Sequence, residues 1–173
     1  MLTVVITGPP GAGKTAALTA LADALSDEDI PHAAIDIEAL AWAHPALTDE
    51  EWSRQVHAVC ALHSDAGRRL LLVAQTLETD HDVERLITAV GADDYFVVRL
   101  EAPPATLAER IVEREPAAWS GLDELVVHAQ ELAATMAALN RVDLVVSTQG
   151  ARAEEVAARI RDAAATLGVL SRR

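Results

Sequence analysis

The sequence has few cysteines and few aromatic residues. Cys60 is the single cysteine among 173 residues, so the chain has no partner for an internal disulfide and no basis for a cysteine metal cluster. Aromatic residues make up 3% of the chain, whereas hydrophobic residues as a whole make up 51%. This apolar content is typical of a folded globular protein with an aliphatic core, and it excludes a disordered chain.

Long apolar runs and basic segments are also missing. No hydrophobic stretch approaches the roughly 20 residues that span a bilayer, and residues 1–6 carry no basic residue of the kind that begins a signal peptide. We therefore expect a cytoplasmic protein without a membrane span. The 27 Asp and Glu residues against 14 Lys and Arg residues give a formal net charge of −13. Such a surface argues against general binding to nucleic acids or to anionic membranes.

Lysine is nearly absent. The chain contains one lysine, Lys14, and its other Lys and Arg residues are all arginines. We interpret this as a compositional bias toward arginine that a single position has resisted. Such a position is expected to need a compact ammonium group rather than a guanidinium.

Apolar, β-branched segments alternate with segments rich in alanine and leucine along the whole chain. Buried strands are predicted at residues 2–7, 33–37, 69–74, 95–100 and 144–147. Helices are predicted at residues 14–25, 48–63, 82–90, 103–114, 122–139 and 153–167, the second of them opened by a Thr48/Glu51 capping box. Apolar strands alternating with helices indicate an α/β fold with a parallel sheet covered on both faces. Residues 1–173 are expected to form one domain.

The lone lysine lies in a glycine-rich motif between a predicted strand and a predicted helix. Residues 8–15, GPPGAGKT, match the phosphate-loop pattern G-x-x-x-x-G-K-[ST]. Glycines let backbone N–H groups converge on phosphate oxygens, the helix N-terminus adds positive potential, and Lys14 reaches the β and γ phosphates. The motif predicts ATP with Mg²⁺, bound through the Thr15 hydroxyl. The predicted nucleotide contacts of the loop are Gly8, Pro9, Pro10, Gly11, Ala12, Gly13, Lys14, Thr15 and Ala16.

Two acids lie at the carboxyl end of the second predicted strand, whereas the third predicted strand ends without one. The third strand leads into Ala74-Gln75-Thr76, so the acid that often supports Mg²⁺ at this position is missing. In an extended chain, Asp36 and Glu38 share one side at the carboxyl end of the second strand, where α/β sheets bind ligands. The alternative interpretation is that Glu38 only opens a helix as a favourable N-terminal acid.

The phosphate loop and the acid pair together resemble the small P-loop kinases of the shikimate kinase and gluconate kinase type. This resemblance covers nearly the whole chain. It implies the three-layer α/β/α fold of P-loop NTPases, with a five-stranded parallel sheet in the order 2-3-1-4-5 and a short lid. In these kinases the first acid of a D-x-D pair supports Mg²⁺ and the second contacts the acceptor hydroxyl. The resemblance therefore implies these roles for Asp36 and for Glu38, which replaces the second aspartate.

A pair of arginines in the helix predicted at 103–114 carries a second resemblance. Arg110 and Arg114 are four residues apart and therefore share a helix face. The segment is similar to the stretch of adenylate kinase-like and gluconate kinase-like enzymes that enters the lid. This similarity implies that Arg110 lies over the adenine, that Arg114 meets the transferring phosphates, and that the lid is about residues 115–121. The alternative is an ordinary solvated helix surface.

The end of the fifth predicted strand and the loop after the acid pair supply the remaining candidates. Thr148, Gln149 and Gly150 resemble the adenine loop of the same kinases and imply contacts to the base, mainly through the backbone. Trp42, His44 and Trp52 fall where such kinases hold their acceptor. The alternative is that the tryptophans pack a helix onto the sheet and that the histidine is structural.

These observations favour an ATP-dependent kinase that phosphorylates a hydroxyl of a small acceptor. Only Arg54, Arg68 and Arg69 are cationic between Asp36 and Leu70, which favours an acceptor of low charge over a nucleotide. Two alternatives remain open. One is a nucleotide-binding switch or weak ATPase that acts through a protein partner, and the other is a nucleoside or nucleotide kinase. The sequence does not indicate an oligomeric state.

Overall fold

The computed structural model describes residues 1–166 and contains one parallel five-stranded sheet. The strands are ordered β2-β3-β1-β4-β5, and each pairs in parallel with its neighbours. This is the order that the resemblance implied. The strands are β1 (Leu2–Thr7), β2 (His32–Asp36), β3 (Leu70–Ala74), β4 (Asp94–Glu101) and β5 (Leu144–Ser147).

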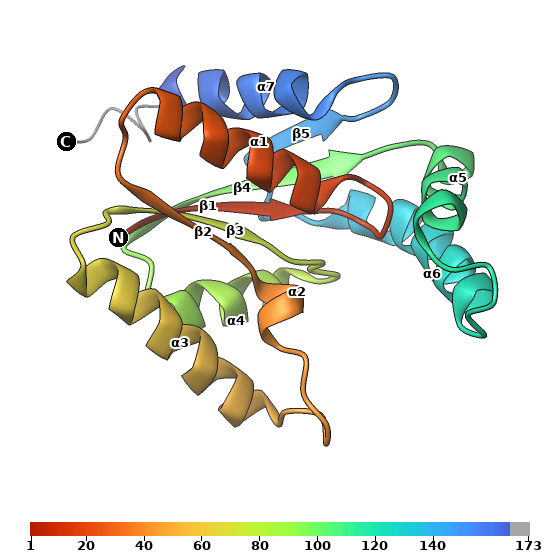
Figure 1. Ribbon diagram of the computed structural model, residues 1–173, viewed down its shortest axis with the longest axis horizontal. Helices are drawn as coiled ribbons and strands as arrows, with labels where there is room; N and C mark the ends of the chain where they lie inside the picture. The colour runs from red at the N-terminus through yellow and green to blue at the C-terminus, as the bar shows by residue number, and fades with distance from the viewer. Residues whose placement is uncertain (167–173) are drawn as a thin grey trace.

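Helices cover both faces of the sheet (Figure 1). Helices α1 and α7 lie on one face and α3 and α4 on the other, while α5 and α6 stand beyond the ends of the strand arrows. The helices are α1 (Lys14–Asp27), α2 (Ile37–Leu40), α3 (Asp49–Asp65), α4 (Asp80–Val90), α5 (Pro104–Arg114), α6 (Leu122–Thr135) and α7 (Ala153–Thr166), with a 3₁₀ turn, η1, at Met136–Ala138. The predicted last residue of the final helix, residue 167, lies outside the described residues.

The boundaries of several elements differ from the prediction for local reasons. The predicted capping box at Thr48 is present, with Glu51 N–H donating to Thr48 Oγ1 at 3.3 Å. Helix α4 begins two residues earlier than predicted because Thr79 forms a second capping box with Asp82. The helix predicted at 122–139 ends at Thr135 and continues only as the turn η1. Helix α2 was anticipated only by the alternative interpretation of Glu38 as an acid that opens a helix.

The core has two layers, one on each face of the sheet. Side chains alternate along the strands, so that Val4, Ile6 and Leu72 pack with α1 and α7, whereas Val5 and Val73 pack with α3 and α4. The central strands are buried on both faces, which explains their continuous apolar sequences. No helix within residues 1–166 is long and apolar enough to cross a membrane.

Cys60 is expected to resist thiol reagents while the protein is folded. It lies on α3 inside the second core layer with no exposed surface, and burial raises the pKa of its thiol to about 11. A rise of two pKa units lowers the thiolate fraction about a hundredfold at a fixed pH near 8, before steric exclusion is counted. The test is the labelling rate in native buffer against that in denaturant. Rapid stoichiometric labelling of the native protein would contradict the placement of α3.

Candidate active site

The carboxyl ends of the strands bring the candidate residues to one edge of the sheet. Parallel register pairs Asp36 of β2 with Ala74 of β3, and Ala74 with Ile6 of β1. The segments that follow these strands, which are the start of α2, the loop after β3 and the phosphate loop, therefore begin side by side. This is the edge where α/β folds bind their ligands.

The phosphate loop closes tightly against the neighbouring elements, and two of its glycines have no room for a side chain. A Cβ on Gly8, where φ is 146°, would lie 2.6 Å from the carbonyl oxygen of Leu100. A Cβ on Gly11, where φ is 80°, would lie 2.8 Å from the carbonyl oxygen of Leu107. Gly13, the N-cap of α1, has left-handed backbone angles. The loop thus ends at a helix N-terminus, where N–H groups are free to receive an anion.

Lys14 is buried at the start of α1 and faces both the loop and the acid pair. Its Nζ donates to the carbonyl oxygen of Gly8 at 3.0 Å and lies 3.5 Å from Glu38 Oε1. Burial lowers the pKa of Lys14, against the opposing charges of Glu38 and Asp36. The ammonium group is therefore a positive charge in a partly desolvated place, where an anion binds it more strongly than in water.

Asp36 caps the helix that follows β2 and also reaches the phosphate loop. Its Oδ2 accepts the Thr15 hydroxyl at 2.8 Å, and its Oδ1 accepts the N–H groups of Glu38 and Ala39 at 3.1 and 3.3 Å. The expectation that the chain stays extended from Asp36 to Glu38 is wrong. An aspartate side chain at a helix N-cap satisfies the first free amides, and here it turns the chain into α2 directly after β2.

The turn into α2 brings Glu38 back toward Lys14. Glu38 Oε1 accepts the backbone N–H of Thr76 at 2.7 Å and the Thr76 hydroxyl at 2.5 Å. Burial tends to raise the pKa of Glu38, but Lys14 and the Thr76 hydrogen bonds outweigh it and lower the pKa below its ordinary value. Glu38 therefore opens a helix, as the alternative interpretation expected, and it also contacts the loop lysine. Its contact with an acceptor hydroxyl stays a prediction.

Thr76 is a site residue that the sequence analysis did not identify. It follows β3, and β3 lies between β1 and β2 in the sheet. Once that order is known, the segment after β3, which includes Thr76, is a neighbour both of the phosphate loop and of the segment after β2. Thr76 could therefore have been identified from the order of the strands in the sheet, but not from any local sequence pattern.

The donor set at this edge fits a hard divalent cation. Thr15 and Asp36 present hydroxyl and carboxylate oxygens 2.8 Å apart, and oxygen ligands are those that Mg²⁺ prefers. At the adjoining strand end, Gln75 Oε1 is buried without a hydrogen-bond partner in the described part of the chain. These residues are compatible with the Mg²⁺ site that the sequence predicted at Thr15 and Asp36.

Arg110 joins the phosphate loop to the segment after β5. Its Nη1 donates to the carbonyl oxygen of Gly11 at 3.2 Å and to Thr148 Oγ1 at 2.9 Å, and its Nη2 donates to the Thr148 carbonyl oxygen at 2.8 Å. A cavity of about 290 Å³ lies beside this clamp, and its walls include Arg110, Thr148 and the loop residues Ala12, Gly13 and Ala16. Five residues predicted to contact the nucleotide therefore line one cavity.

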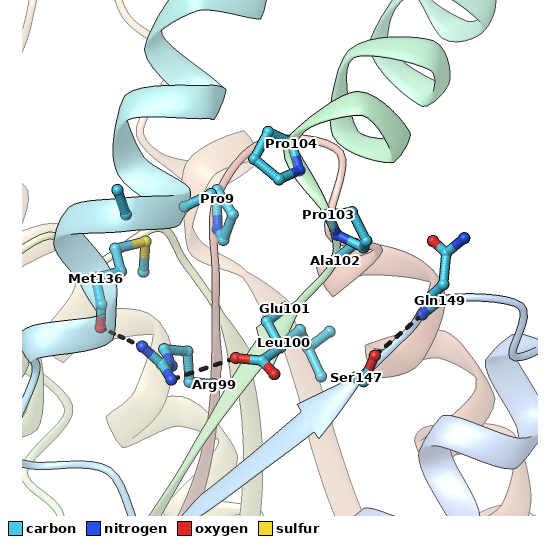
Figure 2. Close-up of a pocket in the computed structure, with 12 residues that line it drawn as sticks. Pro9, Arg99, Leu100, Glu101, Ala102, Pro103, Pro104, Met136, Ser147 and Gln149 are labelled. Carbon is cyan, nitrogen blue, oxygen red and sulfur yellow. Dashed lines mark hydrogen bonds and ion pairs between the residues drawn. The ribbon is translucent and has the colours of Figure 1, made fainter.

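Gln149 and Gly150 lie differently from Thr148. The Gln149 side chain accepts the Thr106 hydroxyl at 2.7 Å and lines a separate pocket of about 500 Å³ that also includes Pro9 and Arg99 (Figure 2). Gly150 has φ of 66° and turns the chain toward α7. Neither residue is among those lining the smaller cavity, so their contact with a base stays a prediction.

The pocket in Figure 2 is distinct from the edge that carries the acid pair. Its walls are mainly proline, alanine and methionine side chains, with Arg99 and Glu101 forming an ion pair at 3.4 Å. Arg99 also donates to the carbonyl oxygen of Met136 at 2.5 Å. Neither Lys14 nor Asp36 is among its lining residues, although the predicted nucleotide contacts Pro9 and Gln149 are.

Arg114 ends α5 on the solvent side of the site. Its side chain is 59% exposed, and its Nε and Nη2 each lie 2.7 Å from Glu115 Oε1. Its charge also contributes to lowering the pKa of Lys14. Residues 115–121, the predicted lid, connect α5 to α6. Arg114 makes no hydrogen bond to the phosphate loop within residues 1–166.

The predicted acceptor residues Trp42 and His44 lie on the exposed connection between α2 and α3. The Trp42 side chain is 87% exposed, and His44 is exposed as well. Trp52, in the first turn of the following helix α3, is buried in the core instead, with the Arg85 guanidinium 4.9 Å from its ring centre. Trp52 thus packs α3 onto the sheet, whereas acceptor contacts of Trp42 and His44 stay predictions.

Comparisons with known proteins show which solved structures share this fold. No family model and no curated protein matches this chain, but solved structures do. A gluconokinase from Sinorhizobium meliloti 1021 has a TM-score of 0.60 and 22% identity, covering 97% of this chain and 92% of its own. A sugar kinase from Janibacter sp. HTCC2649 has a TM-score of 0.66 and 20% identity, covering 98% and 95%.

A third structure holds a nucleotide analogue. The APS kinase CysC from Mycobacterium tuberculosis, solved with AMPPNP and APS, has a TM-score of 0.57 and 14% identity, covering 93% of this chain and 95% of its own. The resemblance predicted from the phosphate loop and the acid pair is thus confirmed for the fold. This chain has the fold of the small P-loop kinases.

Proposed function

We propose that the protein transfers the γ-phosphoryl group of MgATP to a hydroxyl group of a small acceptor of low charge. The observation that carries this proposal is the meeting of the phosphate loop with two acids: Lys14 lies 3.5 Å from Glu38, and Thr15 is hydrogen-bonded to Asp36. Phosphoryl transfer needs positioning and charge stabilisation around the transferring group more than covalent chemistry. The phosphate loop with Lys14 would supply both, and Asp36 would help to hold the Mg²⁺ that neutralises phosphate charge.

Each residue has a defined task in this proposal. The loop amides and Lys14 bind and orient the β and γ phosphates, and Arg110 holds the loop against Thr148 beside the cavity for the base. Asp36 and Thr15 would hold Mg²⁺, which when bound would neutralise phosphate charge. Arg114 is free to swing from Glu115 toward the phosphates as charge develops in the transition state.

The surroundings of the acids favour an acceptor without phosphate. Arg68 and Arg69 precede β3 and therefore lie at the amino ends of the strands, whereas Asp36 lies at the carboxyl ends. Arg85 is engaged with Asp49 at 2.7 Å and with the Trp52 ring. A nucleotide acceptor would need cations for its phosphate groups, so sugars, polyols and other hydroxylated metabolites fit this edge better.

The proposal is tested by a phosphoryl-transfer screen. The protein is incubated with MgATP and panels of sugars, hydroxylated acids, nucleosides, nucleotides and hydroxylated antibiotics, with ATP hydrolysis measured in parallel. Transfer to a hydroxylated compound without phosphate supports the proposal. Transfer only to nucleosides or nucleotides would support the nucleotide-kinase alternative, and acceptor-independent hydrolysis alone would support the switch or weak ATPase.

Replacing Arg114 with alanine is expected to lower turnover by about ten- to a hundredfold with little change in nucleotide affinity. The reason is that a solvent-facing arginine contributes chiefly when charge develops on the transferring group. The measurement is single-turnover transfer beside nucleotide affinity. Arg69→Ala, which removes the same charge at the opposite edge of the sheet, is the control. Equal rates for Arg114→Ala and wild type would remove Arg114 from the site.

A further inference from the structure

Thr76, Glu38 and Lys14 form a chain of contacts whose effect on nucleotide binding the phosphoryl-transfer scheme does not address. Thr76 donates twice to Glu38 Oε1, from its backbone N–H at 2.7 Å and from its hydroxyl at 2.5 Å. The same Oε1 lies 3.5 Å from Lys14 Nζ. The ammonium group that should receive a nucleotide phosphate is thus already paired with a carboxylate.

The two members of this ion pair differ in their freedom. The Lys14 side chain is 8% exposed and Glu38 is 47% exposed. Hydrogen bonds fix both the backbone and the side chain of Glu38. Its N–H donates to Asp36 Oδ1 at 3.1 Å, and its carboxylate accepts the N–H of Thr76. The carboxylate therefore stays in place when an anion approaches, whereas the lysine has a flexible stem that can change partners.

We propose that Glu38 is the resting counter-ion of Lys14 and that a nucleotide phosphate must displace it, so that Glu38 weakens nucleotide binding. Thr76 is the positioning residue that holds Glu38 in this role. A fixed carboxylate beside the phosphate site weakens phosphate binding in two ways. It pairs with the lysine that the phosphate needs, and its negative charge repels the phosphate where water screens charges only in part. This inference rests on the proposed nucleotide site and assigns Glu38 to the nucleotide rather than to the acceptor hydroxyl.

The inference predicts a dependence on the number of phosphates. Lys14 is placed to meet the β and γ phosphates, so the opposition from Glu38 is largest for a nucleoside triphosphate and smaller for a diphosphate. A monophosphate has neither group and escapes it. Glu38 would therefore weaken the binding of ATP more than the binding of ADP. The Glu38–Lys14 pair would thus make nucleotide affinity depend on the number of phosphate groups.

The first test is the affinity of Glu38→Gln for magnesium AMPPNP, measured by calorimetry. Glutamine keeps an oxygen that can accept both Thr76 hydrogen bonds and removes the charge. We expect binding about tenfold tighter than in wild type, on the order of the Coulomb interaction of one charge at such a distance. ADP should gain less, and AMP should be unchanged. Glu78→Gln is the matched control, because Glu78 lies on the same loop as Thr76 and pairs with His128 at 3.5 Å.

The second test separates positioning by Thr76 from a structural role. Thr76→Val removes the hydroxyl but keeps the backbone N–H, so Glu38 is held less firmly and AMPPNP binding should tighten by less than in Glu38→Gln. Thr76→Ser should restore wild-type affinity. In a Glu38→Gln background, Thr76→Val should have no further effect on affinity, since the charge through which it acts is gone.

The outcomes are distinguishable from failure of the proposed function. If wild type binds AMPPNP and Glu38→Gln binds equally well or more weakly, the counter-ion role is overturned and the nucleotide site stands. An equal gain for AMPPNP and AMP, or an equal gain in Glu78→Gln, would overturn it too. If neither wild type nor Glu38→Gln binds AMPPNP, the proposed nucleotide site fails and this inference fails with it.

Discussion

Replacing Lys14 with alanine is expected to remove most of the stabilisation that MgATP gives the folded protein. Binding to the native state alone should stabilise wild type by about 2.7 kcal/mol when the ligand is a hundredfold above its Kd. Lys14 is buried beside the loop that would hold the phosphates, and its charge meets little screening there. The measurement is the thermal shift of each protein with millimolar MgATP.

The fold should survive this substitution. The side chains that attach α1 to the sheet are apolar, with Leu18, Leu21 and Leu25 buried in the first core layer. Arg69→Ala is the matched control, because it removes one positive charge at the opposite edge of the sheet. A Lys14→Ala protein that is folded and still shows the full wild-type shift would mean that the phosphate loop is not the nucleotide site.

Replacing Asp36 with asparagine is expected to lower turnover by about a hundredfold or more while nucleotide affinity changes little. Asparagine is also a good N-cap, so the hydrogen bonds from Glu38 N–H and Ala39 N–H can be kept and α2 should remain in place. What is lost is the negative charge beside the Thr15 hydroxyl. Losses of this size are usual when a positioning or acid–base carboxylate is removed.

The test for Asp36 is single-turnover phosphoryl transfer, or hydrolysis where no acceptor has been found, beside nucleotide affinity. Asp49→Asn is a suitable control, because Asp49 is a first-turn acid of α3 whose partner is Arg85, away from the phosphate loop. A rate equal to that of wild type in Asp36→Asn would remove Asp36 from the mechanism. It would favour a nucleotide-binding switch that acts through a protein partner.

The sequence was informative wherever function depends on local backbone geometry. The phosphate loop was predictable because its glycines, its lysine and its flanking strand and helix are adjacent in the chain. The five strands followed from their apolar composition, since strands buried on both faces carry few polar residues. The Thr48 capping box followed from spacing alone, because both of its hydrogen bonds lie within four residues.

The contacts that define the acid side of the site were not predictable in this way. Glu38 meets Thr76 across 38 residues, and this contact depends on β2 and β3 being neighbours and on the turn that Asp36 imposes after β2. Spacing also failed to separate Trp42, which is exposed, from Trp52, which is buried. Helix α3 alone decides that difference, since it turns Trp52 toward the sheet while the loop before it leaves Trp42 outside.

Tracing the γ-phosphoryl group of ATP tests the proposed transfer reaction itself. Wild type and Lys14→Ala are incubated with Mg²⁺ and γ-labelled ATP in the presence of a pooled set of sugars, polyols and hydroxylated acids, and the label is traced among ATP, inorganic phosphate and organic phosphate esters. We expect label in an organic ester with wild type and none with Lys14→Ala. Label that appears only as inorganic phosphate, or an ester that forms equally well without Lys14, would contradict it.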